Sequence, residues 1–126
     1  MKNESIKRLP DAELTVMQAL WDCPSPAARA DIEAALPGDC AMAMTTLLTQ
    51  LSRLGEKGFV DIARQGRRCL YTPLVSRSDY LAAQSGSFIK KLCGGDIPTF
   101  AAALCDSGLS REDLDELRRL LERDAL

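Results

Sequence analysis

The sequence contains no histidine, which removes the side chain that most often acts as a general base or a metal ligand. No nucleophile is spaced to pair with another base, as a catalytic dyad would require. The five cysteines are scattered without a C-x-x-C pair, so a zinc site would need an unusual set of ligands. We therefore expect no enzymatic activity, no metal and no cofactor.

Long apolar runs are also absent. No stretch approaches the ~20 residues that a membrane span needs, and the short polar start, Met-Lys-Asn-Glu-Ser, is unlike a signal peptide. Hydrophobic residues make up 46% of the chain and charged residues 27%, which is typical of a globular protein. We expect a cytoplasmic protein without membrane insertion.

The net charge of −2 lacks the basic excess that is typical of nucleic-acid-binding proteins. The charge is unevenly distributed, however, because residues 40–75 contain five basic side chains and two acidic ones. The basic residues of this segment are Arg53, Lys57, Arg64, Arg67 and Arg68. The segment is therefore locally positive, as a DNA contact requires.

The segment from Met42 to Gly58 has the period of an amphipathic helix. At about 100° per residue, one face is apolar and the other carries hydroxyls, an amide and cations without an acid. The apolar positions are Met44, Leu47, Leu48, Leu51 and Leu54, and the polar positions are Thr46, Thr49, Gln50, Arg53 and Lys57. Such a face is either the solvated side of a core helix or a DNA recognition helix.

Two shorter helices precede this segment. We expect one to run from Asp11, which is suited to the N-cap, to Asp22, with Trp21 in the core. Prolines at positions 24 and 26 end it, and a second helix is expected over residues 28–36. Two helices leading into a polar-faced third helix indicate a helix-turn-helix.

A β-hairpin is expected directly after the third helix. Residues 59–64 and 68–72 have strand composition, and the intervening turn contains Gly66. A hairpin in this position makes the winged variant of the helix-turn-helix. Its tip carries three guanidinium groups that can bind phosphates, on Arg64, Arg67 and Arg68.

Residues 76–126 are expected to form three helices with apolar stripes. Ser76 and Ser110 are suited to start helices, each with an aspartate three residues on, and Gly94-Gly95 interrupts the segment. Fifty-one residues expose too much apolar surface to be stable alone, so we expect a homodimer through this segment rather than helices that fold back on the winged domain. The dimer contacts are predicted at Tyr80, Phe88, Leu92, Leu114, Leu117 and Leu121.

The predicted fold is thus mainly α with a small β-hairpin wing. It consists of a winged helix-turn-helix DNA-binding domain, residues 1–75, and a C-terminal helical dimerisation domain, residues 76–126. The predicted DNA contacts are Thr45, Thr46, Thr49, Gln50, Arg53, Lys57, Arg64, Arg67 and Arg68.

These motifs together resemble the family of penicillinase repressors and methicillin-resistance regulators, the BlaI/MecI type. The resemblance runs from about Leu9 to Leu121. It is strongest in Leu-Pro-Asp-Ala-Glu-Leu-x-Val-Met-x-x-Leu-Trp, residues 9–21, and in Thr-Leu-Leu-Thr-Gln-Leu-Ser-Arg-Leu, residues 46–54. Leu-Tyr-Thr-Pro-Leu-Val, residues 70–75, resembles the family's exit from the wing.

The resemblance implies a homodimeric transcriptional repressor of β-lactam-resistance-type genes that binds a palindromic operator. It also implies inactivation by an inducer-activated protease from a membrane receptor system. The family's cleavage point, often Asn-Phe, aligns with Ala103-Leu104, and its usual cation before a threonine aligns with Thr45. The C-x-C pairs of a copper-responsive branch are absent.

Two alternatives remain open from the sequence. The near-neutral charge fits a winged-helix module that binds protein instead of DNA. A repressor of the same fold could instead respond to thiol oxidation or to a metal, with Cys40 or Cys69 as the sensing thiol because these residues flank the recognition helix and the wing.

Overall fold

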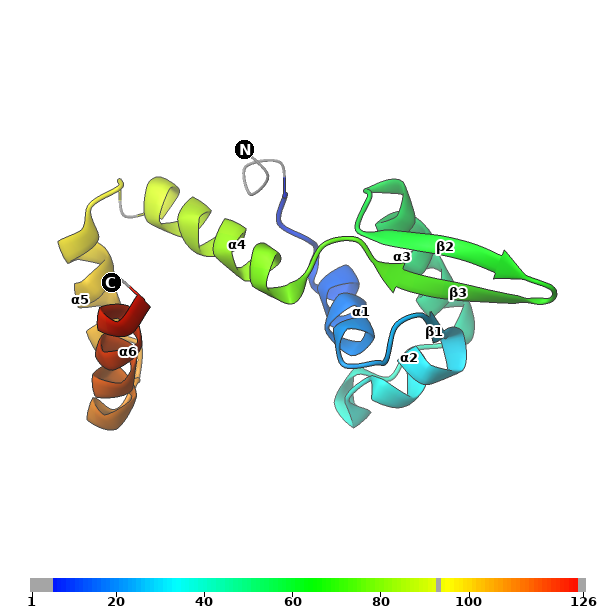
Figure 1. Ribbon diagram of the computed structural model, residues 1–126, viewed down its shortest axis with the longest axis horizontal. Coiled ribbons are helices and arrows are strands. Elements are labelled where there is room, and N and C mark those ends of the chain that lie inside the picture. Colours follow the sequence, from blue (N-terminus) through cyan, green and yellow to red (C-terminus); the bar gives the residue numbers. More distant parts are fainter. Residues whose placement is uncertain (1–5, 93, 125–126) are drawn as a thin grey trace. The chain divides into compact units, whose positions relative to one another are not determined.

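The structure is a computed structural model that describes residues 6–92 and 94–124 (Figure 1). It divides into two compact units, residues 1–84 and 85–126. The first unit contains α1 (Asp11–Trp21), β1 (Ala27–Ala28), α2 (Arg29–Ala35), the 3₁₀ turn η2 (Gly38–Cys40), α3 (Met44–Glu56), β2 (Val60–Gln65) and β3 (Arg68–Pro73). Helix α4 (Arg77–Leu92) begins in the first unit, and the second contains α5 (Ile97–Asp106) and α6 (Arg111–Asp124).

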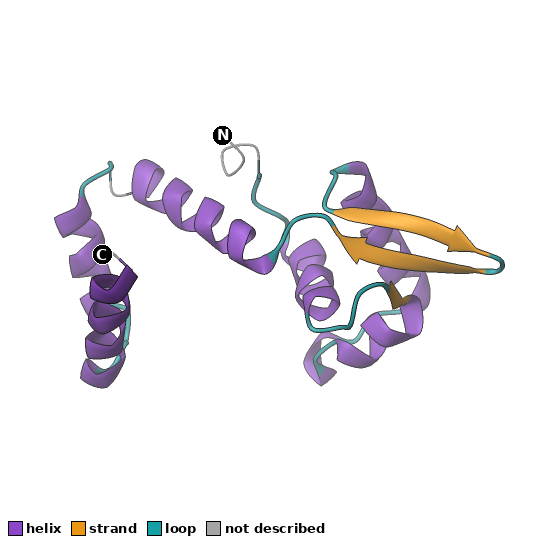
Figure 2. Cartoon of the chain, viewed as in Figure 1, coloured by secondary structure: helices purple, strands orange, loops and turns teal. Residues whose placement is uncertain are grey.

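The first unit has the predicted architecture of three helices followed by a hairpin, and Figure 2 separates its helices from its strands. One apolar core joins these elements, because their inward side chains can leave water only by packing together. The core residues include Val16, Met17 and Leu20 from α1, Ile32 from α2, Leu47, Leu51 and Leu54 from α3, and Phe59, Val60 and Tyr71 from the hairpin and its entry. The predicted fold class is confirmed.

Helix α3 ends in a Schellman motif. The amide of Phe59 donates to the Leu54 carbonyl at 2.9 Å, and the amide of Gly58 donates to the Gly55 carbonyl at 3.1 Å. Gly58 has a φ of +80°, a conformation that only glycine adopts without strain. Because Phe59 and Val60 are buried directly after this cap, the motif fixes where the hairpin leaves the helix.

The sheet has the strand order β1-β3-β2, and all pairs are antiparallel. Gln65 pairs with Arg68 across a two-residue turn in which Gly66 has a φ of +62°. The sequence predicted the hairpin but missed β1, where Ala27 pairs with Tyr71. Two alanines carry no strand pattern of their own, so this strand is specified only by its partner.

The start of α1 differs in detail from the prediction. The N-cap position is Pro10, not Asp11, and no side chain caps the helix. Asp11 is instead the first helical residue, where its negative charge still interacts favourably with the helix dipole. Helix α2 is shorter than expected, and the Asp31 carboxylate accepts a hydrogen bond from the Ala28 amide at its start, at 3.0 Å.

The beginning of α4 packs within the first unit. The Trp21 indole donates to the Val75 carbonyl at 2.9 Å, and the Tyr80 hydroxyl accepts from the Leu9 amide at 2.9 Å. Arg77 lies over the Trp21 ring and pairs with Asp22 at 2.7 Å. The first unit therefore extends to residue 84, past the predicted boundary at residue 75.

In the second unit, α6 has a capped start, and no described side chain of the unit is buried. The Ser110 hydroxyl accepts from the Asp113 amide at 3.0 Å, and the Asp113 carboxylate accepts from the Ser110 amide at 3.3 Å, which is the predicted capping box. Phe88 and Phe100 make an edge contact with ring centroids 5.8 Å apart. The apolar stripes of the unit thus remain largely accessible.

Candidate nucleic-acid interface

The exposed face of α3 carries most of the polar side chains that the sequence placed on it. Thr45, Thr46, Thr49 and Arg53 are all exposed. The Thr49 hydroxyl donates to the Thr45 carbonyl at 2.9 Å, so its oxygen can still accept a hydrogen bond from a ligand. Ser52, which the sequence analysis did not include, is exposed between Thr49 and Arg53 and extends the same face.

Gln50 does not belong to this exposed face. Its residue is only 9% exposed, because the buried arc of α3 is wider than the apolar pattern indicated and includes this position. Its neighbours Leu47, Leu51 and Leu54 are fully buried on the same side of the helix. The prediction of Gln50 as a DNA contact therefore has no support in the structure.

Lys57 forms an ion pair inside the first unit. Its Nζ lies 2.8 Å from the carboxylate of Glu13 on α1, and the Glu13 side chain is only 2% exposed whereas that of Lys57 is 42% exposed. A buried carboxylate requires a charged or hydrogen-bonding partner, and Lys57 is the cation that neutralises it. This pair ties the end of α3 to α1, and the phosphate contact predicted for Lys57 stays a prediction.

Two apolar residues lie on the outside of α3, contrary to the prediction. Met44 is 52% exposed and Leu48 is 37% exposed. They are separated by one helical turn, so their side chains are neighbours on the surface. The exposed face of α3 therefore combines hydroxyls, one guanidinium and two apolar side chains, with Glu56 in its last turn.

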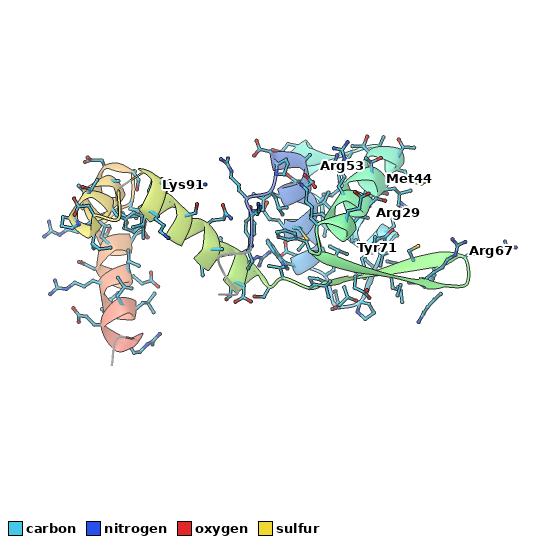
Figure 3. The ribbon with its side chains drawn as sticks, turned by 90° about the horizontal axis from the view of Figure 1, so that it is seen from above. Arg29, Met44, Arg53, Arg67, Tyr71 and Lys91 are labelled. Carbon is cyan, nitrogen blue, oxygen red and sulfur yellow. The ribbon has the colours of Figure 1, made fainter. Side chains whose placement is uncertain are left out.

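The wing carries the three predicted arginines on its exposed part. Arg64, Arg67 and Arg68 all lie next to the Gly66 turn, and Figure 3 labels Arg67 at the end of the hairpin. The Arg64 guanidinium donates to the Gly66 carbonyl at 3.2 Å, which holds it against the turn. Asp61 is also exposed on β2, but it lies at the other end of the hairpin.

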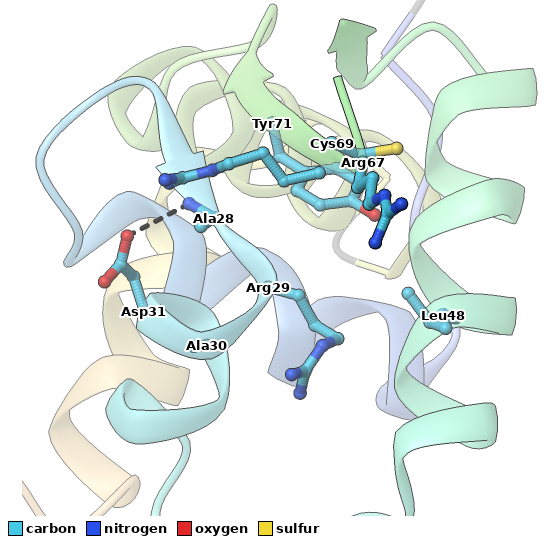
Figure 4. Close-up of a pocket in the computed structure, with 9 residues that line it drawn as sticks. Ala28, Arg29, Ala30, Asp31, Leu48, Arg67, Cys69 and Tyr71 are labelled. Atoms are coloured by element: carbon cyan, nitrogen blue, oxygen red, sulfur yellow. Dashed lines mark hydrogen bonds between the residues drawn. The ribbon is translucent and has the colours of Figure 1, made fainter. Parts of the chain in front are cut away.

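A groove of about 590 Å³ joins the wing to α2 and α3. In Figure 4, Leu48 points from α3 toward the groove, opposite Cys69, Arg67 and Arg29. The groove is lined by Ala28, Arg29, Ala30, Asp31, Leu48, Arg67, Arg68, Cys69 and Tyr71. Three arginines thus surround a partly apolar surface that three elements share.

Arg29 is a basic residue of this surface that the sequence analysis missed. It is the first residue of α2, and its guanidinium pairs with Glu33 one turn later at 3.0 Å, both side chains being partly exposed. Such a partly exposed pair contributes little to stability, so the guanidinium can exchange its partner for a phosphate. Arg29 lies outside the basic segment 40–75, so the sequence did not indicate that it belongs to this surface.

The pKa values of two side chains in the first unit are raised, those of the Cys23 thiol and the Tyr71 phenol. Burial, reinforced by the carboxylates of Asp31 and Asp22, raises the pKa of the Cys23 thiol, which makes it a poor nucleophile. Burial also raises the pKa of the Tyr71 phenol, with a further rise from the Cys69 thiol and a partial offset by Arg29. The phenol is therefore neutral at physiological pH and adds no negative charge to the groove, where Asp31 is the acidic residue among the lining side chains.

The thiol and metal alternatives find no added support. Cys40 and Cys69 are half-buried and free, and within residues 6–92 and 94–124 no three side chains of the cysteine, aspartate or glutamate type are grouped to hold a metal ion. In the same part of the chain, no helix combines the length and the apolar character that crossing a membrane would require.

The residues predicted to form the dimer fall into two groups. Tyr80 is buried in the first unit between the rings of Trp21 and Phe59, so its side chain is not accessible to a second chain. The others lie in the second unit, where Leu114 and Leu117 are half-buried. Phe88 and Leu121 are exposed, and the side chain of Leu92 lies outside the described part.

Ala103 and Leu104, the cleavage point that the resemblance implied, lie inside α5. A protease binds its substrate in an extended conformation, so cleavage there requires the second half of α5 to unfold locally. No described residue of α5 is buried, which keeps the free energy of such an opening small.

Comparisons with known proteins agree with this geometry. A family model described as "Penicillinase repressor" matches residues 9–123. The penicillinase repressor of Bacillus licheniformis is 31% identical over 120 residues, which cover 94% of this chain and 93% of that protein. The methicillin resistance regulatory protein MecI of Staphylococcus aureus is 30% identical over 79 residues, 62% of this chain and 64% of that protein.

A solved DNA-binding domain is also similar to part of this chain. The solution structure of the DNA-binding domain of the repressor BlaI is 33% identical, covers 60% of this chain and 90% of that domain, and superposes with a TM-score of 0.51. A match that covers 60% of the chain is close in length to the first unit, which contains the winged helix.

Proposed function

Because the chain belongs to the penicillinase repressor family, we propose that it is a transcriptional repressor that binds a palindromic operator as a homodimer. In this proposal α3 enters the major groove, while Arg29 and the wing arginines bind the flanking phosphates. Occupancy of the operator blocks the promoter of β-lactam-resistance-type genes, and the protein has no catalytic role. The single observation that carries the proposal is the surface shared by α2, α3 and the wing.

The chemistry of that surface fits duplex DNA. Arg29, Arg67 and Arg68 surround the groove beside α3, and Arg53 extends the positive surface along the helix. Guanidinium groups bind phosphates through paired hydrogen bonds and release counterions, which supplies affinity. The hydroxyls of Thr45 and Thr49 lie toward the N-terminal end of α3, where recognition helices usually contact base edges.

The homodimer is supported by the second unit. Its exposed large apolar side chains are Phe88, Ile97, Leu109, Leu120 and Leu121, and none of its described side chains is buried. A unit of this size that leaves so much apolar surface in water needs a partner to be stable. A second copy of the same unit supplies an equivalent face, and two copies of the winged helix would match the two halves of a palindrome.

Replacing Arg53 with alanine tests the DNA-binding face. Duplexes enriched from a random-sequence pool by the full-length protein provide the probe, and affinity is measured by fluorescence anisotropy at several salt concentrations. We expect a loss of about tenfold or more, since a guanidinium contact to a base or a phosphate is worth ~1–3 kcal/mol. The slope of log affinity against log salt should also fall in magnitude if Arg53 binds phosphate.

Arg118 provides the matched control. It is an exposed arginine of α6, outside the proposed DNA-binding face, and it pairs with Glu122 one helical turn later. Arg118→Ala should leave the affinity unchanged. Equal affinity of Arg53→Ala and the original protein would show that the assigned face is wrong. Salt-insensitive behaviour, or no retention on DNA at low salt, would favour the alternative of a protein-binding winged helix.

We also propose that an inducer-activated protease inactivates the repressor by cutting at Ala103-Leu104. The position inside a helix without buried residues supports access by local unfolding. Mass spectrometry of the protein from cells treated with a β-lactam should detect a fragment that ends at Ala103, which untreated cells lack. A repressor that stays intact while its target genes are induced would contradict this route.

A further inference from the structure

We propose that Met44 and Leu48 contact thymine methyl groups, so that each operator half-site carries thymines where the first two turns of α3 meet the major groove. The inference rests on the proposed DNA-binding function and adds which base the helix selects. It concerns side chains that the sequence pattern had assigned to the core.

The polar groups of α3 leave little capacity to distinguish bases. The amide of Gln50, which would suit adenine, is buried, and the ammonium of Lys57 is held 2.8 Å from the Glu13 carboxylate. Hydroxyls such as those of Thr45 and Thr49 bond to several base edges and discriminate weakly. In the described part of α3, Arg53 is therefore the one exposed side chain that can make a paired, base-selective hydrogen bond.

The two apolar side chains lie where a recognition helix contacts bases. Met44 is the first residue of α3 and Leu48 follows one turn later, and the N-terminal part of such a helix makes most contacts with base edges. Thymine is the base that presents an apolar group there, its C5 methyl. A contact of Leu48 or Met44 with this methyl removes apolar surface of both partners from water.

The surroundings of Leu48 favour DNA over an apolar partner. Leu48 lines a groove whose charged lining residues are three arginines, Arg29, Arg67 and Arg68, and one acid, Asp31. Figure 4 shows Leu48 on the side of the groove that faces Arg29 and Arg67. A protein surface that covered this patch would have to desolvate or pair the guanidiniums of Arg67 and Arg68 and the partly exposed pair of Arg29 with Glu33. A DNA backbone supplies phosphates for these guanidiniums while the base edges reach the apolar centre. The charge complementarity therefore identifies duplex DNA as the occupant.

Substitution of deoxyuridine for thymine tests the contact directly, because uracil keeps the base pair and the O4 acceptor and lacks only the methyl group. Single substitutions are placed in a duplex that the full-length protein has enriched from a random pool. We expect at least one thymine in each half-site at which the substitution weakens binding by about three- to fivefold, the effect of one buried methyl group.

The double variant Met44→Ala, Leu48→Ala assigns the effect to these side chains. Both residues are exposed and alanine favours helices, so the fold should persist, which circular dichroism checks. In the variant the deoxyuridine penalty should disappear. Leu74→Ala is the control: Leu74 is a 58% exposed leucine of the same unit that does not line the groove, and its variant should keep the penalty.

Three results would contradict the proposal, and they distinguish a failure of the methyl contact from a failure of the proposed DNA-binding function. If deoxyuridine weakens binding nowhere, or if its penalty persists in the double variant, the methyl contact is refuted while operator binding stands. If the protein enriches no duplex from the pool, the proposed DNA-binding function fails, and this inference fails with it.

Discussion

Replacement of Lys57 with alanine should lower the free energy of unfolding by about 2–3 kcal/mol. The substitution leaves the carboxylate of Glu13, which is 2% exposed, without its cation. Removing one partner of a fully buried ion pair costs roughly 3–5 kcal/mol, and we expect a smaller value because the Lys57 side chain is itself partly exposed. Urea unfolding followed by circular dichroism measures the change.

Two comparisons separate the buried charge from other effects. Arg118→Ala breaks an exposed pair with Glu122 and should change stability by no more than about 0.5 kcal/mol. The double variant Glu13→Leu, Lys57→Met removes both charges and should recover most of the loss, since apolar replacements of buried pairs are tolerated. A stable Lys57→Ala protein would mean that Glu13 does not depend on this cation.

The same double variant tests whether Lys57 also binds DNA, as the sequence predicted. A phosphate contact would add about 0.9 to the magnitude of the salt slope, and its loss would be visible even in a stable protein. We expect the slope of the double variant to equal that of the original chain.

Replacement of Leu121 with aspartate should abolish the proposed dimer and weaken operator binding by at least about 100-fold. Leu121 is 61% exposed in the single chain, so aspartate is tolerated there, but an isologous interface would bury two unpaired carboxylates. A dimer binds its second half-site as an intramolecular event, which typically increases affinity by about 10²–10⁴. Sedimentation measures the assembly and fluorescence anisotropy measures the affinity.

Leu74→Asp is the control, because Leu74 is similarly exposed but lies in the first unit. It should leave both the assembly and the affinity unchanged. A chain that sediments as a monomer at about micromolar concentration and still binds its operator with full affinity would refute the proposed dimer.

The sequence predicted those features that depend on neighbouring residues. Gly58 after α3, Gly66 in the hairpin and the Ser110–Asp113 capping box all lie where expected, because each is specified within a few positions. The resemblance drawn from the motifs is confirmed by the family match over residues 9–123. Local patterns of this kind were sufficient to predict the helices and the hairpin and to indicate the family.

Features that depend on distant contacts were not predictable. The partner of Lys57 is Glu13, 44 positions earlier, so the sequence could not show that this cation was occupied. Gln50 is polar, but the packing of α3 buries it, and Leu48 is apolar, but it lies on the exposed side of the helix. Arg29 joins the basic surface only because α2 starts beside the wing.

The start of α4 also provides a built-in optical probe. Trp21 is the only tryptophan, its indole donates to the Val75 carbonyl, and the Arg77 guanidinium lies 5.6 Å from its ring centre. The emission of a single indole depends on the polarity and charge around it, and the chain segment that enters α4 contributes to both here. Intrinsic fluorescence can therefore follow, without any attached dye, how this connection responds when DNA is bound.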